Sequence, residues 1–556
     1  MSLLAALFLL INKASYHGYF QHDDFAHMSW CTKGSWTSLV AGALSPEFCP
    51  HLFRPLGHLH YHLMEKAVGL TYWPFLAAVQ VYHLAAAWVL WVVLRRLRFG
   101  VAAAAAVVVF FTLNMAVFRI FWNPAFVFDL GCGLFCLISF LLWMDRRWIA
   151  SFVFFFLAYR WKETAIMLPA VLGLYEIFLA ERKEWRRLVP FLAVSAWFGV
   201  QGLLSFRGGG PTEYQFAATG GAVGETVRYY ASRVFLIPWA GLVLAVAPWF
   251  GRDRRLQFGC AAFWALLCPM LLLPGHPNDT YLYVPMLGVA VAVAAMFERW
   301  GRFAILGFFL IWLPADYLAL RARRSDNLHE ADENRPYVAA LTEIVRAHPF
   351  TSEFVFEASP AGLPDWGIES ALRYFYPPMN VTLRQIRTDQ DRAGVPGAPA
   401  VLLGWDPLGR QLRAIERRAD TAYPSYFRMN GLEPVWALTD GWHGADRGYR
   451  WSTPHATAVL RQPAGANEFQ LQVMMPEEQR ETAVAVALDG VALGEIRFRG
   501  KGSQSGALAV PAGPERQVRV ELTVPAGFRP PTADPRGLGV AVEAFGFSTR
   551  QPPSKP

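Results

Sequence analysis

The sequence is poor in charged residues. Asp, Glu, Lys and Arg make up 17% of its 556 residues, whereas soluble domains average about 25%. The deficit is confined to residues 1–320, which are dominated by long apolar stretches, while residues 325–556 have the composition of an ordinary soluble domain. This contrast excludes a chain built only of soluble domains and predicts a membrane domain followed by a globular one.

Cysteine is also scarce, with six residues and none beyond residue 325. The C-terminal region therefore has neither disulfide staples nor a zinc ribbon. Cys31 and Cys49 share the first long loop, where they would form a disulfide if the loop faces an oxidising space. The other four lie in apolar segments and are most simply small packing residues: Cys132, Cys136, Cys260 and Cys268.

No small-residue cleavage site follows the first apolar segment, so no cleavable signal peptide is expected. The net charge of +8 does not indicate a nucleic-acid partner. Much of the Lys and Arg excess lies in short clusters between apolar segments, where basic residues set membrane topology.

The apolar pattern predicts about eleven membrane-spanning helices, since a span needs about 20 mostly apolar residues. They lie near residues 1–14, 74–94, 100–118, 124–144, 148–159, 164–180, 188–206, 234–250, 256–273, 281–297 and 303–320. Alternate loops are short and basic, around residues 95–98, 146–147, 182–187, 252–255 and 299–302, and should be cytoplasmic. The longer loops and the C-terminal domain should then face outward, although Arg321, Arg323 and Arg324 after the last span argue for the opposite side.

The first outer loop, residues 15–73, is too long for a simple connector. It contains the acidic pair Asp23-Asp24 and an arginine, Arg54, in the run Leu52-Phe53-Arg54-Pro55-Leu56-Gly57-His58. It also holds seven of the thirteen histidines: His17, His22, His27, His51, His58, His60 and His62. Such a concentration of acids, histidines and an arginine is what a polar reaction centre at a membrane surface needs.

Sugar transfer from a lipid phosphate to a hydroxyl would use these residue types. The acceptor hydroxyl must lose a proton, so a carboxylate base is required, and the leaving phosphate needs cationic help. We predict Asp24 and Asp23 as the catalytic pair, with mutual repulsion raising the pKa of one of them. The alternative is that both acids form a solvated turn after a helix.

Two further outer segments carry polar side chains. Tyr159-Arg160-Trp161-Lys162-Glu163 could hold the donor phosphate together with Arg54 and His58, with Glu163 orienting Arg160 or Lys162. The alternative is a snorkelling interface anchor. Asp129, near the outer end of a span, should face the protein interior. Expected donor or acceptor contacts are His27, His62, His276, Asp279 and Tyr281, although Tyr281 also fits an interfacial aromatic belt.

A metal ion is an open question at this stage. His58 and His62 would share one face of a helix at i,i+4 spacing, and Asp23 with Asp24 would suit a divalent ion such as Mg²⁺ or Mn²⁺. The simpler interpretation is that both histidines hydrogen-bond a phosphate or neighbouring loops.

Three motifs together resemble the membrane glycosyltransferases of the GT-C fold. They are Asp23-Asp24, the Phe53-Arg54-Pro55-Leu56 run before an apolar span with His83, and Lys162-Glu163 before Leu168-Pro169. The sequence is most similar to the transmembrane-and-TPR O-mannosyltransferases and their bacterial relatives, in which Tyr281-Leu282-Tyr283-Val284-Pro285 has a counterpart. The resemblance covers about residues 10–320.

The resemblance implies a polyprenyl-phosphate-sugar donor, inversion at the anomeric carbon, and an acidic base that maps to Asp23 or Asp24, of which we favour Asp24. The chain departs from the eukaryotic relatives because no 34-residue repeat follows residue 320. The acceptor, whether protein, lipid or polysaccharide, therefore stays open.

The C-terminal region has two parts. Residues 325–345 look like a charged helical linker, and the region 325–420 reads as a small α/β unit. Residues 430–550 contain short β runs at about ten-residue spacing, which predict a β-sandwich or jelly roll. The segments 441–452 and 534–540 resemble accessory sandwich modules of bacterial envelope glycosyltransferases. Trp442 or Trp451 could stack on a sugar ring if exposed; the alternative is that both are core residues.

The sequence as a whole predicts an inverting, polyprenyl-phosphate-dependent glycosyltransferase of the bacterial inner membrane, with its chemistry on the outer face. The main alternative is a transporter or flippase of lipid-linked sugars, which should carry charges at mid-membrane. Few charges lie there, and most gather at span ends. A further alternative is a non-catalytic envelope assembly factor.

Overall fold

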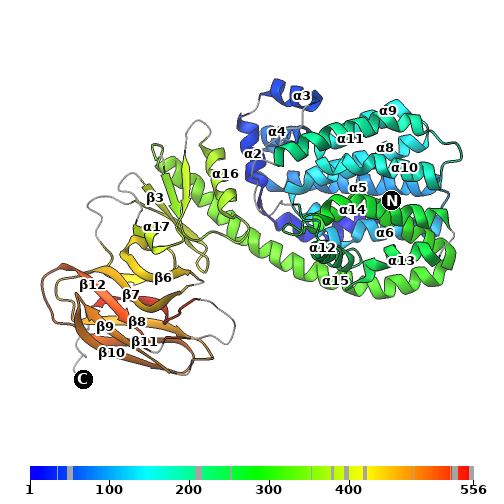
Figure 1. Cartoon of the computed structure of the whole chain (residues 1–556). Coiled ribbons are helices and arrows are strands. Elements are labelled where there is room, and N and C mark those ends of the chain that lie inside the picture. Colours follow the sequence, from blue (N-terminus) through cyan, green and yellow to red (C-terminus); the bar gives the residue numbers. More distant parts are fainter. Residues whose placement is uncertain are drawn as a thin grey trace. The chain divides into compact units, whose positions relative to one another are not determined.

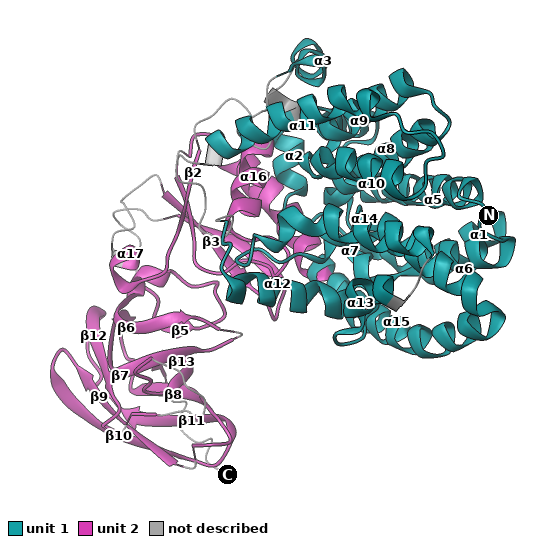
Figure 2. Cartoon of the chain, turned by 45° about the vertical axis from the view of Figure 1, so that its right-hand side comes forward, with its two compact units in different colours: residues 1–331 teal, residues 332–556 magenta. Residues whose placement is uncertain are grey.

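The computed structural model describes residues 1–33, 35–46, 54–206, 216–250, 253–351, 353–376, 381–393, 400–416, 423–446, 448–479, 481–525, 527–528 and 536–549. The chain divides into two compact units, Met1–Ala331 and Asp332–Pro556, shown in different colours in Figure 2. Unit 1 is helical, and the β-strands all belong to unit 2.

The helices of unit 1 follow the apolar pattern of the sequence (Figure 1). A helix occurs at each apolar segment expected to span. The helices are α1 (Ser2–Ile11), α2 (Asp24–Lys33), α3 (Trp36–Leu44), α4 (Pro55–Val68), α5 (Tyr72–Arg96), α6 (Val101–Leu113), α7 (Phe118–Trp122), α8 (Val127–Met144), α9 (Trp148–Trp161), α10 (Leu168–Phe178), α11 (Trp185–Phe206), α12 (Gly220–Arg233), α13 (Val243–Phe250), α14 (Arg254–Leu271) and α15 (Met286–Ala347).

Five helical segments of the described chain are long and apolar enough to cross a membrane. They are Tyr72–Arg96, Val101–Trp122, Pro124–Met144, Trp185–Leu204 and Met286–Ala347. Shorter apolar helices cover Ser2–Ile11, Trp148–Trp161 and Ala240–Trp249. The chain is therefore a membrane protein. Its number of spans lies between the five long segments of the described chain and the eleven spans that the sequence predicts.

The long element α15 is broken at Gly301, where φ is 70° and ψ is −159°. Nothing lies within 4 Å of the position a Cβ would take there, so the backbone conformation and not crowding favours glycine. The break separates the two spans that the sequence predicts at 281–297 and 303–320. The second arm continues through residues 325–345, so the expected helical linker is part of one helix.

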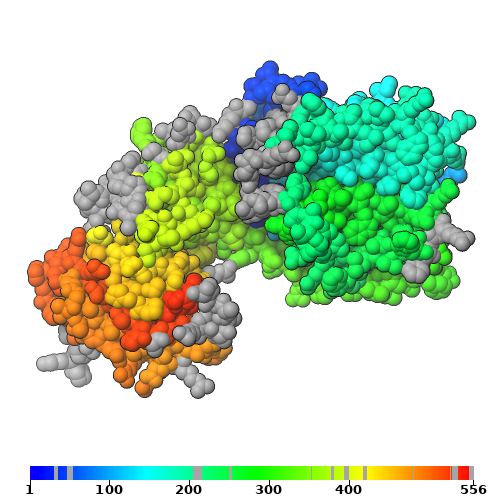
Figure 3. Space-filling view, in the orientation of Figure 1, coloured from blue at the N-terminus to red at the C-terminus, as the bar shows by residue number. Residues whose placement is uncertain are grey.

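Large apolar side chains cover the outside of unit 1, as expected of helices that face lipid. Ile149 on α9 is 84% exposed, Phe303 on α15 is 74% exposed and Val189 on α11 is 61% exposed. The cyan and green segments that include these helices form the surface of unit 1 in the view of Figure 3. An apolar surface of this extent is consistent with a bilayer around the unit.

Unit 2 begins with a four-stranded sheet in the order β2-β1-β3-β4. Strand β1 pairs in parallel with β2 and β3, and β4 runs antiparallel to β3. The expected α/β unit therefore forms. Its elements are β1 (Glu353–Phe356), α16 (Asp365–Phe375), β2 (Thr382–Gln385), α17 (Asp389–Ala393), β3 (Ala400–Asp406) and β4 (Gln411–Glu416).

The rest of unit 2 is an antiparallel sandwich with strand order β10-β9-β12-β7-β13-β8-β11. Strand β7 pairs with β12 over its C-terminal half and with β13 at its start, so it belongs to both layers. The strands are β5 (Tyr426–Arg428), β6 (Leu438–Ala445), β7 (Arg450–Gln462), β8 (Glu468–Met475), β9 (Glu481–Leu488), β10 (Val491–Arg499), β11 (Gly502–Ala509), β12 (Arg516–Thr523) and β13 (Ala541–Ser548).

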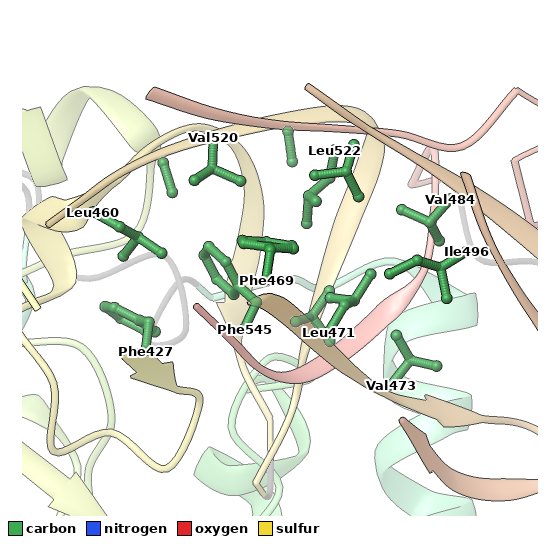
Figure 4. Packing of buried hydrophobic residues seen from close by; sticks show 14 of the residues in the cluster. Phe427, Leu460, Phe469, Leu471, Val473, Val484, Ile496, Val520, Leu522 and Phe545 are labelled. Atoms are coloured by element: carbon green, nitrogen blue, oxygen red, sulfur yellow. The ribbon is translucent and has the colours of Figure 1, made fainter. Parts of the chain in front are cut away.

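The sandwich core fills the space between its layers, and Figure 4 shows Phe469 and Phe545 at its centre. Trp442 belongs to this core. It is 4% exposed, stacks on Phe545 at 5.7 Å and donates its indole N–H to the Thr457 carbonyl at 2.8 Å. The expectation that Trp442 could stack on a sugar is therefore wrong, because its ring already covers the core. Trp451 is half-buried and stacks on Phe528.

A buried ionic network joins the α/β part of unit 2 to the sandwich. Glu357, just after β1, accepts hydrogen bonds from Arg450 of β7 at 2.5 and 2.6 Å and from Arg392 of α17 at 3.1 Å. The three side chains are 9%, 5% and 1% exposed. Removing one partner of so buried a set leaves an uncompensated charge, so the network holds the two parts together.

We expect Phe545→Ala to lower the free energy of unfolding of the sandwich by about 3–5 kcal/mol, since it deletes the ring shared by Phe469 and Phe427. Protease susceptibility of the full chain across a urea series measures the change. Val491→Ala, at a site that is 71% exposed, is the control and should alter it by less than about 0.5 kcal/mol. Equal effects of the two substitutions would contradict the assigned core.

Candidate functional site

Asp24 is the most buried acid of the first outer segment. It is 0% exposed at the first position of α2. Its Oδ2 accepts a hydrogen bond from the backbone N–H of Gln21 at 2.8 Å, and its Oδ1 accepts one from the Tyr61 hydroxyl at 2.6 Å. Two donors thus hold the carboxyl group in one orientation.

Burial raises the pKa of Asp24 to about 7, because a carboxylate is costly to remove from water. The hydrogen bonds from Tyr61 and Gln21 oppose this shift, and the charge of Asp23 adds to it. A group with this pKa is partly ionised near neutral pH and can both take and release a proton, which is the property of a general base.

Asp23 has a different environment although it is the next residue. Its side chain is exposed, and its backbone carbonyl accepts the N–H of His27 at 3.0 Å as α2 begins. The two acids of the pair are therefore separated by the start of the helix, one facing inward and one outward. This asymmetry makes Asp23 a matched control for Asp24.

An aromatic layer connects Asp24 to the cations of the site. The Phe128 ring lies 4.3 Å from the His27 ring, 6.1 Å from Tyr61 and 5.4 Å from His58, measured between centroids. Helix α4 reaches this layer because residue 57 is glycine, since a Cβ at Gly57 would lie 2.0 Å from the Phe128 ring. The loop that carries Asp24 is thereby packed on the start of α8.

Arg54 and Glu163 form a two-pronged ion pair between the start of α4 and the segment after α9. The distances are 2.9 Å from Nε to Oε2 and 2.7 Å from Nη2 to Oε1. Burial alone would raise the pKa of Glu163, but the charge and hydrogen bonds of Arg54 lower it to about 2. Glu163 is therefore a permanent anion that orients Arg54.

Lys162 pairs with Asp129, the acid expected to face the interior. The ammonium lies 2.8 Å from both carboxylate oxygens, and the two side chains are 8% and 4% exposed. The Tyr281 ring lies 5.2 Å from the same ammonium, within range of a cation–π contact. Tyr281 stands at the end of the turn η7 (Asp279–Leu282), which brings the start of α15 to the site.

His58 is neutral and turned toward its own helix. Burial lowers the pKa of His58 to about 4, and its Nδ1 lies 2.9 Å from the Arg54 carbonyl. The same Nδ1 lies 3.2 Å from the backbone nitrogen of Arg54, so hydrogen bonding to the Arg54 backbone holds the ring in place in either neutral tautomer. In this state His58 suits a hydroxyl better than a phosphate.

The residues expected to bind a metal do not form such a set. His62 packs against the edge of the Trp36 ring at 4.6 Å, and both oxygens of Asp24 accept protein hydrogen bonds. In the part of the chain that the structure describes, no group of three or more His, Cys, Asp or Glu side chains is close enough to hold an ion. No step below is assigned to a metal.

Of three other expected residues, two lie elsewhere and one flanks the site. The guanidinium of Arg160 lies 5.0 and 5.1 Å from the rings of Phe156 and Phe198, between α9 and α11. Asp279 forms a second polar cluster, accepting hydrogen bonds from Arg323 at 2.6 Å and from Tyr229 at 2.5 Å. His276 lies 6.1 Å from the ring of Tyr281 and so flanks the site.

The two motif residues His83 and Tyr283 meet below the site. The Tyr283 hydroxyl lies 3.1 Å from His83 Nδ1, and His83 Nε2 lies 3.1 Å from the Thr112 carbonyl. Nε2 is therefore the donor and Nδ1 the acceptor. These hydrogen bonds tie Tyr283, the residue that follows η7, to α5 and α6, two residues along the chain from Tyr281.

Some expectations lie outside the described residues. Cys49, His51 and Phe53 belong to the segment 47–53, and the side chain of Cys31 is not described either. The Cys31–Cys49 disulfide therefore stays a prediction. Of the cysteines expected to pack in apolar segments, Cys132, Cys136 and Cys260 are buried and Cys268 is exposed.

Tyr61, which donates a hydrogen bond to Asp24, is a residue of this cluster that the sequence analysis does not single out. It follows His58 by three residues on α4 and therefore shares its face of the helix. This i,i+3 spacing predicts the shared face, but the sequence analysis considers only His58 and His62 on it. For Asp129 the sequence predicts only that the side chain faces the protein interior, and not that it pairs with Lys162.

No protein-family model and no curated protein matches this sequence. Among solved structures, the chain is similar to the cryo-EM structure of the arabinofuranosyltransferase AftD from Mycobacteria, with 11% identity, a TM-score of 0.46, and 100% of this chain and 60% of that chain covered. A structure of a mutant of the same protein gives 12% identity, a TM-score of 0.42, and coverage of 98% and 60%. The chain thus spans about three-fifths of the length of these proteins, which are not the O-mannosyltransferases that the motifs resemble. Similarity at this level carries no function over to the present chain.

We expect Lys162→Met to destabilise unit 1 by about 3–5 kcal/mol, because it leaves Asp129 buried without a partner. Lys162→Met combined with Asp129→Leu should recover much of the loss. Lys66→Met, which changes an exposed ammonium, should cost less than about 1 kcal/mol. Thermal unfolding of the full chain in detergent measures the relative stability of these variants. A double variant less stable than Lys162→Met would contradict the pairing.

Proposed function

We propose that this chain is an inverting membrane glycosyltransferase that moves a sugar from a polyprenyl-phosphate carrier to a hydroxyl of an envelope acceptor, with Asp24 as the general base. The single observation that carries the proposal is the Asp24 carboxyl group. This group is fully buried and accepts hydrogen bonds from two donors, and its pKa is raised to about 7. A merely structural acid would be better solvated or paired with a cation.

The reaction needs one base and no acid. The acceptor oxygen attacks the anomeric carbon from the face opposite the phosphate, and its proton passes to Asp24. The bond from the anomeric carbon to the phosphate oxygen breaks, and the polyprenyl phosphate leaves with that electron pair. A phosphate is a stable anion at neutral pH, so it leaves without protonation, which explains the need for one ionisable carboxyl group and not two.

We assign the phosphate to Arg54 and Lys162. Both cations are held in place by acids, Arg54 by Glu163 and Lys162 by Asp129. Each retains N–H donors beyond those its partner uses, because a guanidinium has five and an ammonium three. Oriented donors that need no reorganisation stabilise charge developing on the leaving oxygen more effectively than mobile ones.

We assign the sugar to the aromatic and histidine side of the site. His58 is neutral because burial lowers its pKa to about 4, and His27 is neutral because burial, together with the nearby His58, Arg54 and Lys162, lowers its pKa well below the usual value. Neutral imidazoles suit sugar hydroxyls. Tyr281 offers a ring beside Lys162 on which a sugar or isoprenoid could stack.

The proposal places this site on the outer face of a bacterial inner membrane, because the basic loops at the other ends of α5, α8 and α9 favour the cytoplasmic side. The partners are then the lipid-linked donor, the bilayer and a glycan, lipid or protein acceptor. The C-terminal sandwich would lie on the outer side, where envelope acceptors are found.

We expect Asp24→Asn to reduce kcat for sugar transfer by about 10²–10⁴-fold, since the base is lost while the shape of the site is kept. Membranes carrying the full chain, supplied with radiolabelled polyprenyl-phosphate sugars, provide the assay. Asp23→Asn is the matched control and should retain activity within a few-fold, because its carboxylate faces solvent.

Equal activity of wild type and Asp24→Asn would overturn the assignment of the base. Label that changes leaflet without leaving the carrier would replace the transferase with a flippase.

We expect Tyr61→Phe to shift the acidic limb of the pH profile of kcat/KM upward by about one unit. In the wild type this limb reports an apparent pKa of about 7, with activity rising as Asp24 ionises. The Tyr61 hydrogen bond stabilises the carboxylate, so its loss raises the pKa further. A profile that falls in amplitude without moving would mean that Tyr61 acts only through packing.

A further inference from the structure

A second polar site lies at the opposite ends of the helices that carry the Asp24 cluster. Helices α5 and α8 run from that cluster to Arg96 and Met144, and α9 begins at Trp148 and returns to it. At about 1.5 Å per residue, the 16 residues from Asp129 to Met144 span roughly 23 Å. A cavity of about 570 Å³ opens there, lined by the ends of α5, α8 and α10 and the starts of α9 and α14.

The lining of this cavity is strongly basic. It contains five arginines against two glutamates. The arginines are Arg96, Arg98, Arg146, Arg182 and Arg255. They lie at or next to helix ends in four separate parts of the chain, so the fold gathers into one pocket charges that are scattered in the sequence. Guanidinium groups bind phosphate oxygens with two parallel hydrogen bonds, so such a pocket is suited to a phosphate group.

Three of the five arginines form ion pairs, Arg96 with Asp145, Arg146 with Glu184 and Arg255 with Asp253. The charges of the other two are not neutralised in this way. The pair between Arg98 and Glu181 is 3.7 Å long with both side chains 86% exposed, so it contributes little. Arg182 is exposed and takes part in no ion pair among the described residues. The buried Glu176 is used internally, because its oxygens accept hydrogen bonds from the Trp143 indole at 2.9 Å and the Glu184 amide at 2.8 Å.

The backbone also directs arginine into the pocket. Arg98 and Arg146 have φ of 63° and 60°, just after the ends of α5 and α8. This left-handed position at a helix end normally selects glycine or asparagine. An arginine there bears a conformational cost at both places, and at both it lines the cavity. The presence of arginine at both positions, despite this cost, indicates that its guanidinium group, and not the geometry of the turn, accounts for the choice of residue.

The surroundings favour a lipid as the source of the phosphate. Trp143, Trp148 and Tyr175 line the same cavity, and such rings gather where headgroups meet acyl chains. Directly after Trp148, α9 presents Ile149 and Val153, which are 84% and 47% exposed. An apolar surface thus continues from the basic pocket along a helix, as acyl chains attached to a bound headgroup require.

We propose that this pocket binds the phosphate of an anionic phospholipid headgroup, on the face of the membrane opposite the Asp24 cluster. Basic pockets between membrane helices are suited to such headgroups. The proposal does not depend on the glycosyltransferase assignment. It differs from the general preference of cytoplasmic loops for Lys and Arg, because that preference requires basic residues on this face but not their convergence around a cavity.

The experiment is a titration of the full chain in detergent with phosphatidylglycerol, followed by native mass spectrometry. Arg98→Gln with Arg182→Gln removes two charges and leaves the internal hydrogen bonds in place. Arg186→Gln with Arg187→Gln removes two exposed charges from the same loop region but outside the cavity. We expect the affinity for the first lipid to fall about tenfold or more in the pocket variant and to stay unchanged in the control. Arg182→Gln alone, at an exposed site, should show a smaller loss in the same direction.

Three outcomes would overturn the lipid site. Equal losses of lipid affinity in the two double variants would mean that the lipid binds to a diffuse basic surface and not to the pocket. Binding that neither variant weakens would exclude the pocket. Excess inorganic phosphate could displace phosphatidylglycerol and bind only to chains that keep Arg98 and Arg182. That result would assign the pocket to a free phosphate ion instead.

Discussion

The dehydrated ion pair between Lys162 and Asp129 organises the polar end of unit 1. Neither charge could remain between apolar helices without the other, so the end of α9 is tied to the start of α8. At Lys162 the backbone leaves the helix and becomes extended, with φ −159° and ψ 146°. The next residue, Glu163, then lies opposite Arg54. Tyr281 lies beside the same ammonium, so one contact sets the relative positions of three segments distant in the sequence.

This arrangement also explains the state of Asp24. Both cations near the aromatic layer have acids of their own, which leaves Asp24 with only neutral donors, the Tyr61 hydroxyl and the Gln21 amide. Burial is then not offset by a direct ion pair, and the pKa stays near neutrality instead of falling. A fold that had used Lys162 to pair with Asp24 would have produced a permanently ionised acid and a poor base.

Much of this site could be predicted from the sequence, and the limits are physical. The apolar periods predict where helices occur, and polar groups at their ends stand out because charge is costly beside lipid, as at Lys162 and Glu163. Pairing between distant residues is another matter. Nothing local links Arg54 to Glu163, and the expectation that Glu163 would orient Arg160 or Lys162 followed sequence proximity, whereas helix geometry sends Arg160 toward Phe198.

The C-terminal unit shows the same contrast. Alternating apolar residues at 468–473 and 518–524 predict strands, and the strands occur there. The burial of Trp442 depends on Phe545, which follows it by about a hundred residues, so a local pattern could not separate a core tryptophan from an exposed one. Side-chain periodicity reports which face is buried, but the identity of the neighbour on that face is a property of topology.

The strand order of the sandwich has a consequence for the timing of its folding. Among the described strands β13 comes last in the chain, yet it pairs with β5, β7 and β8, and β7 links both layers. The core around Phe545 therefore cannot close until the ribosome has released residues 541–548. Up to that moment β7 and β8 have exposed edges, which are templates for pairing with other chains. The sandwich is thus vulnerable to aggregation during synthesis for as long as β13 is not available to pair.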